Sequence, residues 1–512
     1  MVKAMSEQHF DVLIIGAGVS GIGAACHLNR ECPDRTYAII ERRQAMGGTW
    51  DLFKYPGIRS DSDMFTFGYN FKPWLNPQTL ADGPSIKRYV EEAAAENGVD
   101  KNIHFGLKML GAEWSSKDAR WTVTVQDEAN GENQTYSCNF LMGCTGYYNY
   151  DKGFRPDFPG EENFKGVKIH PQHWPEDLDY SGKKVVIIGS GATAITLVPA
   201  MTDKAAHVTM LQRSPTYIMS LPAIEPMTAK MQQYLPEKLA YRITRARNVR
   251  FQRFLYRLSR NRPKFMRRFL LSAARKRLGD QVDMADFTPQ YNPWDERMCM
   301  VPDGDMFNVV REGKASVVTD HIESFTENGI RLKSGKELEA DIIVTATGLD
   351  LQVMGGAELK VDGRPTLIHE RLTYKGVLLE GIPNAAMVFG YINASWTLKA
   401  DIAAEYVCRV LNHMSSKGYS KVVAKDAADH KTDHTVFGAL SSGYVQRANK
   451  VLPRQGTAGP WVVTQDFMRD APDLRFSPIE DEYLSFDDRP PAGEPSITAK
   501  VGGTLRAVVS RV

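Results

Sequence analysis

FDVLIIGAGVSG, residues 10–21, decides the fold of the N-terminal part of this chain. Residues 10–15 form a short apolar run typical of a buried parallel strand, and residues 22–28 predict a helix. Between them, Gly16 permits a tight turn, Gly18 lets a pyrophosphate approach the backbone, and Gly21 lets helix and strand pack closely. The helix N-terminus then offers free N–H groups and a partial positive charge to phosphates. The alternative is a purely structural strand–helix turn.

The next strand, residues 37–40, favours the nucleotide-binding interpretation because it ends in an acid. Glu41 follows Gly21 by twenty residues, where a carboxylate accepts hydrogen bonds from both ribose hydroxyls and repels a 2′-phosphate. The pattern therefore predicts FAD or NAD, and not NADP. The residues expected to hold this first dinucleotide are Gly16, Gly18, Ser20, Gly21 and Glu41.

The same pattern returns at residues 184–213 with a different ending. A KVVII strand precedes GSGATA at residues 189–194, and the following strand, residues 207–211, leads into Arg213. A guanidinium at the strand end can grip a 2′-phosphate bidentately, so this second site favours NADPH. The alternative is that Arg213 merely faces solvent. The expected NADPH-binding residues are Gly189, Ser190, Gly191, Ala192, Thr193, Ala194, Gln212 and Arg213.

Two dinucleotide sites of opposite preference imply hydride transfer from NADPH to a bound flavin, which makes the first cofactor FAD. Strands 140–146 and 341–348 end in small residues and mark crossings between the two nucleotide domains. We therefore expect an α/β fold of two Rossmann-like domains. The predicted parts are FAD-binding at 1–150 and 349–485, NADPH-binding at 151–222 and 296–348, a helical insertion at 223–295, and a C-terminal tail at 486–512.

The bulk composition fits an enzyme of a reducing compartment. Hydrophobic residues make up 43% of the 512 residues and the net charge is only +2, so the whole chain does not suggest a nucleic-acid binder. The six cysteines lie far apart with no CxxC pair, which argues against disulfides and a metal site. Residues 12–29 lack charged side chains, but they are too polar and glycine-rich for a signal peptide or membrane span. We expect a cytoplasmic enzyme.

The reaction is indicated by motifs outside the glycine turns. A redox cysteine pair is missing from residues 46–61, which argues against a disulfide reductase. FKGVKIHPQHWP at residues 164–175 resembles the FxGxxxHxxxW(P/D) fingerprint of type I Baeyer–Villiger monooxygenases, and GTWDLFKYPGIRSD at 48–61 resembles the second signature of that family. YNPWDER at 291–297 looks most like the ethionamide monooxygenase subgroup. The fingerprint positions are Phe164, Gly166, His170 and Trp174.

The resemblance implies an activity and roles for particular residues. In this family, reduced flavin and O₂ give a C4a-peroxide that converts ketones to esters or lactones and thioethers to sulfoxides. By motif match, Arg297 stabilises the developing negative charge and Asp61 holds that arginine, because a fixed cation where charge develops is a strong catalytic device. The alternative for Arg297 is a structural ion pair. The resemblance also implies cofactor contacts from Thr49, Trp50, Asp51, Leu52, Arg59, Ser60 and Asp61.

Other features qualify this picture. Family members often carry Lys where this chain has Glu296, so NADPH selection rests more heavily on Arg213. The family pattern suggests that His170 and Trp174 organise a hinge and perform no chemistry. One competing function is that of a flavin-containing N- or S-hydroxylating monooxygenase or an oxidase, and Trp174 argues against it. Another is that of an NADPH-dependent electron-transfer reductase. Residues 393–396 are expected near the substrate, and the tail from Arg489 is expected to be mobile.

A basic segment at residues 239–278 stands apart from these motifs. It holds twelve arginines and two lysines with no acid, and apolar residues interleave at roughly helical spacing. The first interpretation is a helical insertion with a solvated basic face. The alternative is peripheral attachment to an anionic membrane, since basic amphipathic helices bind such surfaces. Nucleic acid is a distant third.

Overall fold

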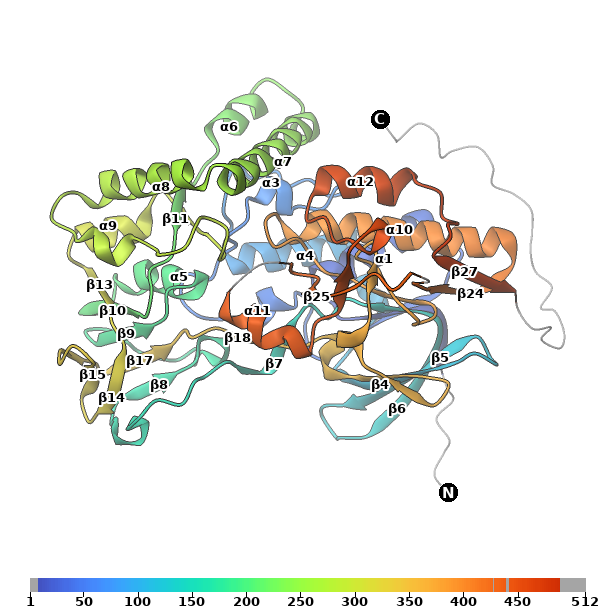
Figure 1. Ribbon diagram of the computed structural model, residues 1–512, viewed down its shortest axis with the longest axis horizontal. Coiled ribbons are helices and arrows are strands. Elements are labelled where there is room, and N and C mark those ends of the chain that lie inside the picture. Colours follow the sequence, from blue (N-terminus) through green and yellow to red (C-terminus); the bar gives the residue numbers. More distant parts are fainter. Residues whose placement is uncertain (1–7, 427, 439–441, 489–512) are drawn as a thin grey trace.

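A computed structural model describes residues 8–426, 428–438 and 442–488 of the chain. Within this part, an 11-stranded sheet and a five-stranded sheet lie side by side, the latter on the left of Figure 1. A group of helices runs along the upper edge of both sheets. The predicted tail from Arg489 lies outside the described residues.

The large sheet is built around β1 (Gln8–Ile15), which lies parallel between β2 (Tyr37–Glu41) and β6 (Asn133–Gly143). Ile14 packs beneath α1 (Val19–Glu31), α4 (Gly83–Glu96) and α10 (Trp396–Lys417), whereas Leu13 faces the core on the other side. Burial of both faces explains why residues 12–15 are all apolar without alternation, whereas Phe10 and Asp11 before them are only partly buried. The other strands are β3 (Ile103–Phe105), β4 (Leu107–Ser115), β5 (Arg120–Asp127), β19 (Glu358–Val361), β20 (Arg364–Thr366), β21 (Thr373–Tyr374), β22 (Leu378–Leu379) and β23 (Ala385–Met387).

The five-stranded sheet is parallel throughout, in the order β13-β10-β9-β17-β8. Its strands are β8 (Val167–Ile169), β9 (Lys184–Ile188), β10 (His207–Gln212), β13 (Ala315–Thr319) and β17 (Ile342–Thr345). Helices α5 (Ala192–Met201) and α9 (Asp305–Arg311) cover one face. A small antiparallel sheet of β14 (Ile322–Thr326), β15 (Gly329–Leu332) and β16 (Glu337–Glu339) covers the other. The predicted α/β fold with two dinucleotide-type units is thus present, while its exact domain boundaries stay predictions.

Shorter elements connect and complete these layers. The antiparallel pair β7 (Tyr148–Gly153) and β18 (Leu349–Leu351) links the two sheets. The remaining strands are β11 (Ile218–Leu221), β12 (Cys299–Pro302), β24 (Tyr419–Ala424), β25 (Lys431–Thr435), β26 (Arg454–Gly456) and β27 (Leu484–Asp488). The remaining short helices are α2 (Thr49–Leu52), α3 (Met64–Phe67), α11 (Gly443–Arg447) and α12 (Phe467–Phe476).

Each glycine-rich turn packs against the end of a neighbouring strand of its own sheet. Gly16 has φ +104°, and a Cβ atom there would lie 2.7 Å from the carbonyl oxygen of Cys144, just after β6. Gly189 has φ +136°, and its Cβ would lie 2.3 Å from the carbonyl oxygen of Ala346, just after β17. Both positions therefore require glycine, for its backbone conformation and for the close approach.

The third small position differs between the two turns. A Cβ on Gly21 would lie 1.8 Å from the carbonyl oxygen of Gly16, so the first turn accepts no side chain there. In the second turn the equivalent Ala194 is fully buried with its methyl group in place. The first turn therefore requires glycine at its third small position, whereas the second turn accommodates the methyl group of alanine there.

We expect Gly189→Ala to destabilise the five-stranded sheet unit by about 1–3 kcal/mol, the usual cost of forcing an extra carbon into a packed site. Gly191→Ala is the matched control, because nothing lies within 4 Å of a Cβ at that position and its φ is −78°. Urea unfolding of both variants measures the difference. Equal stability would show that the backbone at Gly189 has room to relax.

The predicted insertion forms three helices, α6 (Pro226–Gln232), α7 (Glu237–Asn261) and α8 (Pro263–Leu278). Helix α8 packs against α9 and β11 beside the five-stranded sheet, whereas α7 reaches over to α3 of the other unit (Figure 1). The insertion therefore bridges both units. In the described part of the chain, no helix is both long and apolar enough to cross a membrane.

A buried charge network attaches α7 to the large sheet unit. Nη1 of Arg245 donates to three carbonyl oxygens at the end of α3, at 2.6 to 3.2 Å, and Nη2 lies 3.7 Å from Asp401 of α10. Asp401 also contacts His27 of α1 at 3.3 Å and accepts from the N–H of Asn70. Arg245 therefore attaches α7 to the large sheet unit. Only part of the basic segment at residues 239–278 forms a solvated face.

The same network predicts a pH dependence of stability. Burial alone lowers the pKa of His27, but hydrogen bonds to Asp401 and Glu31 outweigh it and raise the pKa to about 9, above the ordinary 6.5. A raised folded-state pKa stabilises the protein fully below pH 6.5, and this stabilisation is lost as pH rises through about 9. We expect His27→Gln to flatten the decline in melting temperature over that range, with His413→Gln as the control. An unchanged decline would contradict a charged His27.

Candidate functional site

A cavity of about 940 Å³ lies where the two sheet units meet. Both glycine-rich turns open into it, and its size is in the range of small-molecule and cofactor sites. Gly21 and Ala194 are not among its lining residues, since they face the packing between helix and strand. The predicted cofactor-binding residues that line it from the two nucleotide motifs are Gly16, Gly18, Ser20, Glu41, Gly189, Ser190, Gly191, Ala192, Thr193, Gln212 and Arg213.

Two helix N-termini face this cavity. Helix α1 begins after Gly18 and α5 after Gly191, and neither N-cap residue makes a side-chain capping bond. The first N–H groups of each helix are therefore available to an anion, and the helix dipole adds positive potential. Two separate anion sites on one cavity fit two dinucleotide pyrophosphates.

Glu41 is held rigidly at the end of β2. Its side chain is buried, and its two oxygens accept from the N–H of Ala17 at 2.7 Å and of Arg43 at 2.8 Å. Burial raises the pKa of Glu41, while these two backbone donors oppose the rise. Each carboxylate oxygen keeps a second lone pair for a ligand hydroxyl.

The second site presents one fixed and one exposed side chain at the end of β10. Gln212 is buried and donates to the carbonyl oxygen of Asp286 at 2.7 Å and to Thr319 at 2.8 Å, so its side chain fixes the strand end. Arg213 is exposed and lines the cavity. Glu296 also lines the cavity. Burial raises the pKa of Glu296, and the positive charge of Arg213 opposes this rise.

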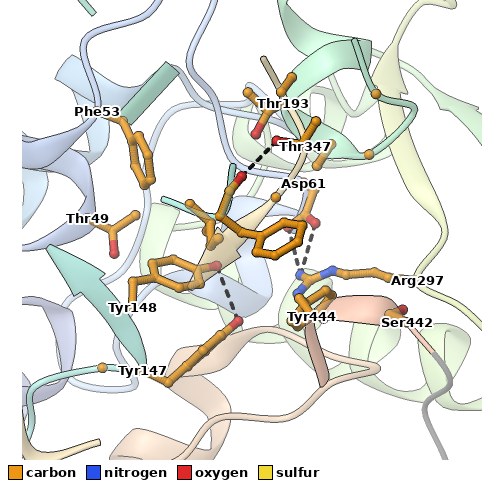
Figure 2. A pocket seen from close by; sticks show the side chains of 18 of the residues that line it. Thr49, Phe53, Asp61, Tyr147, Tyr148, Thr193, Arg297, Thr347, Ser442 and Tyr444 are labelled. Atoms are coloured by element: carbon orange, nitrogen blue, oxygen red, sulfur yellow. Dashed lines mark hydrogen bonds and ion pairs between the residues drawn. The ribbon is translucent and has the colours of Figure 1, made fainter. Parts of the chain in front are cut away.

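Arg297 and Asp61 meet inside the cavity although 236 positions separate them in sequence. Nη2 of Arg297 lies 2.9 Å and 3.1 Å from the two oxygens of Asp61 (Figure 2). The Asp61 carboxylate raises the pKa of Arg297 well above its usual value, so the guanidinium is always charged. Because Asp61 contacts Nη2, the remaining N–H donors are left for other partners.

Three tyrosines line the same cavity as this ion pair. Tyr147 and Tyr148 follow β6, with their hydroxyl oxygens 3.2 Å apart, and Tyr444 comes from α11. All three line the cavity, and burial raises the pKa of each, so their hydroxyls are neutral donors near Arg297. The sequence argument missed them. Tyr147 and Tyr148 directly follow the small-residue turn at 144–146, which is a usable signal, whereas no local motif indicates Tyr444.

A second ion pair joins the two units beside the first. Arg59 contacts Asp305 of α9 through both terminal nitrogens, at 2.6 and 3.3 Å. Its Nε is buried and has no hydrogen-bond partner among the described residues. Close by, Gly57 has φ +74°, and a Cβ there would lie 2.5 Å from the Cβ of Ala200 on α5. The motif at 48–61 therefore places a tight turn directly against the second nucleotide unit.

The rest of that motif divides between cavity and core. Thr49, Trp50, Ser60 and Asp61 line the cavity, together with Arg59. Asp51 instead pairs with Arg43 at 2.6 Å and with Lys87 at 2.7 Å, and Leu52 is buried in the core shared with α5. The side chains of Asp51 and Leu52 thus point away from the lining, and any contact they make with a cofactor would be through their backbone.

The fingerprint residues lie between the cavity and the core and do not line the cavity. A Cβ on Gly166 would lie 2.3 Å from the carbonyl oxygen of Asp341 and 2.5 Å from the ring of Phe164, which explains this glycine. Trp174 is buried in the core beneath α5.

His170 contacts both of the segments that link the two sheets, β7 and the residue before β18. Its Nδ1 accepts from the N–H of Gln172, and its Nε2 lies 3.3 Å from the carbonyl oxygen of Gly348, just before β18. A Cβ on Gly153 of β7 would lie 1.9 Å from the ring. Burial lowers the pKa of His170, which fits a neutral ring accepting at Nδ1 and donating at Nε2.

Comparison with known proteins assigns the family. The family model described as FMO-like, flavin-binding monooxygenase-like, matches residues 10–452. The chain belongs to this family. It is 58% identical over 484 residues to the "Putative FAD-containing monooxygenase MymA" of Mycobacterium tuberculosis (strain H37Rv), covering 94% of this chain and 98% of the relative. It is 52% identical over 481 residues to "FAD-containing monooxygenase EthA" of Mycolicibacterium smegmatis, covering 94% and 97%.

The fold has a solved counterpart in "Oxidized steroid monooxygenase bound to NADP", with a TM-score of 0.73 at 21% identity, covering 94% of this chain and 100% of that structure. The predicted fold class and the predicted flavin monooxygenase family are therefore confirmed. The reaction subtype and the roles of single residues rest on the geometry of the cavity.

Of the residues expected near the substrate, Ala394 and Trp396 line the cavity. Trp396 donates from its indole nitrogen to Ser20 at 2.7 Å, and its ring lies 5.1 Å from that of Tyr147. Asn393 donates to the carbonyl oxygen of Gln465, and Ser395 is buried against Thr66. The stretch 393–396 therefore alternates between lining the cavity and supporting it.

Proposed function

We propose that this protein is an FAD-containing, NADPH- and O₂-dependent monooxygenase of the Baeyer–Villiger type, which converts ketones to esters or lactones and oxidises thioethers to sulfoxides. The observation that carries the proposal is the Arg297–Asp61 pair at the place where two anion-binding turns open into one cavity. The names of the MymA and EthA relatives state that they contain FAD, and the steroid monooxygenase was solved with NADP.

The described residues fit both cofactors. At the first turn, the uncapped N-terminus of α1 would hold the FAD pyrophosphate and Glu41 the ribose hydroxyls. At the second turn, α5 would hold the NADPH pyrophosphate and Arg213 the 2′-phosphate. The buried, unused Nε–H of Arg59 would find an acceptor on a bound dinucleotide. When bound, the flavin supplies hydride acceptance, O₂ activation and oxygen transfer.

In this proposal, Arg297 would stabilise negative charge on the reacting oxygen atoms. Asp61 fixes the guanidinium from one side and Tyr444 lies beside it, so its orientation would be set before a substrate arrives. A preorganised donor stabilises developing charge more strongly than water does, because it need not reorient as the charge forms. His170, which touches both crossing strands, would keep the two units in register without taking part in the chemistry.

Substrate-dependent oxygen consumption tests the proposed function. With NADPH and an aryl ketone, a cyclic aliphatic ketone or a thioether, we expect one O₂ and one NADPH consumed per ester, lactone or sulfoxide formed. NADPH oxidation that yields only hydrogen peroxide would indicate an oxidase. NADPH oxidation that requires an added redox protein would indicate an electron-transfer reductase.

Replacement of Arg297 tests the mechanism. We expect Arg297→Ala to lower the rate of ketone oxygenation by about 100- to 1000-fold, the usual effect of removing one such donor. FAD content and anaerobic flavin reduction by NADPH should change little, because hydride transfer develops no charge at that position. Arg297→Lys should recover little activity, since an ammonium lacks the planar fork. Arg331→Ala, at an exposed ion pair on β15, is the control. Near-normal ester formation by Arg297→Ala would mean that the arginine is structural.

Coenzyme choice tests the second site. We expect Arg213→Ala to raise the KM for NADPH roughly tenfold or more while leaving that for NADH nearly unchanged, because only NADPH offers a 2′-phosphate. Glu296→Lys should lower the KM for NADPH, since it replaces an acid of the cavity lining with a cation. Steady-state kinetics with both coenzymes measures this, and equal effects on NADPH and NADH would show that this rim does not contact the 2′-phosphate.

A further inference from the structure

The outward side of α7 and α8 exposes large apolar side chains beside a high density of positive charge. We call this surface the α7–α8 face. Its apolar members are exposed by 42% to 59%, which is unusual for side chains of this size in a soluble domain. They are Leu239, Ile243, Phe251 and Phe254 on α7, and Phe265 and Phe269 on α8.

The exposure follows the helical repeat. On α7, positions 239, 243, 246, 250, 254, 257 and 261 are all exposed, and their spacing of three or four residues places them on one stripe. The opposite stripes are buried, with Tyr241 and Val249 on α7 and Met266 and Leu270 on α8. Both helices are therefore packed against the rest of the protein on one side, and the exposed apolar side chains lie on ordered helices.

The charge on this face is only partly neutralised. Arg245, Arg247, Arg253, Arg257 and Arg260 have acidic partners, so these arginines mainly attach α7 to its surroundings. Six further exposed cations of α7, α8 and the link between them have no carboxylate within ion-pair distance among the described residues. They are Arg250, Arg262, Lys264, Arg268, Arg275 and Lys276.

We propose that the α7–α8 face is a docking surface for an anionic lipid bilayer, into whose interface the phenylalanines insert while the free cations contact the headgroups. Apolar residues and cations on one helical stripe match the two components of such an interface. A second copy of this chain would bring unneutralised positive charge against positive charge. Nucleic acid would gain little from Leu239 and Ile243. The proposal is independent of the proposed reaction.

Vesicle sedimentation of the FAD-loaded protein tests the proposal. We expect binding to vesicles of phosphatidylcholine with 30% phosphatidylserine, little binding to phosphatidylcholine alone, and release at high salt as the charges are screened. Two variants separate the contributions. The first double variant, Phe254→Ser and Phe265→Ser, removes two apolar side chains that would insert into the bilayer. The second, Arg250→Glu and Arg268→Glu, reverses two free charges. We expect each double variant to lose vesicle binding at least tenfold.

The control variants carry changes of the same kind outside the α7–α8 face. Leu367→Ser alters an exposed apolar residue outside the face, and Lys117→Glu with Lys333→Glu reverses two exposed charges in the hairpins β4–β5 and β15–β16, far from α7 and α8 in Figure 1. These variants should bind like the parent protein. Flavin content and melting temperature show that each variant is folded.

The remaining outcomes would overturn the proposal. One such outcome is that the protein sediments with neither kind of vesicle. Another is equal binding to neutral and anionic vesicles, and a third is that both α7–α8 variants bind as well as the parent protein. A parent protein that dimerises through this face, with the phenylalanine variant monomeric by light scattering, would assign it to a second copy. Binding of single-stranded RNA that the charge variant loses, in the absence of lipid binding, would assign it to nucleic acid.

Discussion

The close approach of two glycine-rich turns to the ends of neighbouring strands is the constraint on which the rest of this structure depends. At Gly16 and Gly189 the backbone adopts a positive φ and lies too close to a carbonyl oxygen for any side chain to fit. This packing lets β1 and β9 feed directly into α1 and α5, whose N-termini then face the same cavity. A side chain at either turn would move a helix end and with it an anion site.

The relative position of the two units depends on polar links near the cavity. Arg297 with Asp61 and Arg59 with Asp305 each join the two units, and His170 contacts both strands that cross between them. The insertion adds a third attachment, because α8 packs on one unit while Arg245 of α7 reaches buried acceptors of the other. Arg297, the arginine for which we propose a catalytic role, is thus also one of the links between the units.

The fingerprint of the family has a structural explanation in this chain. Gly166 allows Phe164 to pack beside the backbone of Asp341, and His170 needs Gly153 to reach the crossing strand. None of these side chains lines the cavity. The fingerprint of this family can therefore consist of residues that pack around the segments linking the two units, outside the cavity lining.

Some features of this protein were determined by local sequence. The two nucleotide turns, the acid at the end of β2 and the cation after β10 were predictable because a strand, a turn and a helix N-terminus form from neighbouring residues. The Arg297–Asp61 contact was predictable only through the family resemblance. Tertiary structure alone decided that Tyr147, Tyr148 and Tyr444 line the same cavity as that arginine, that Asp51 turns away from the cavity, and that Arg245 contacts α3 and α10 while Phe254 is exposed. These outcomes depend on which distant elements pack together, and a contact between residues hundreds of positions apart leaves no periodicity in the chain.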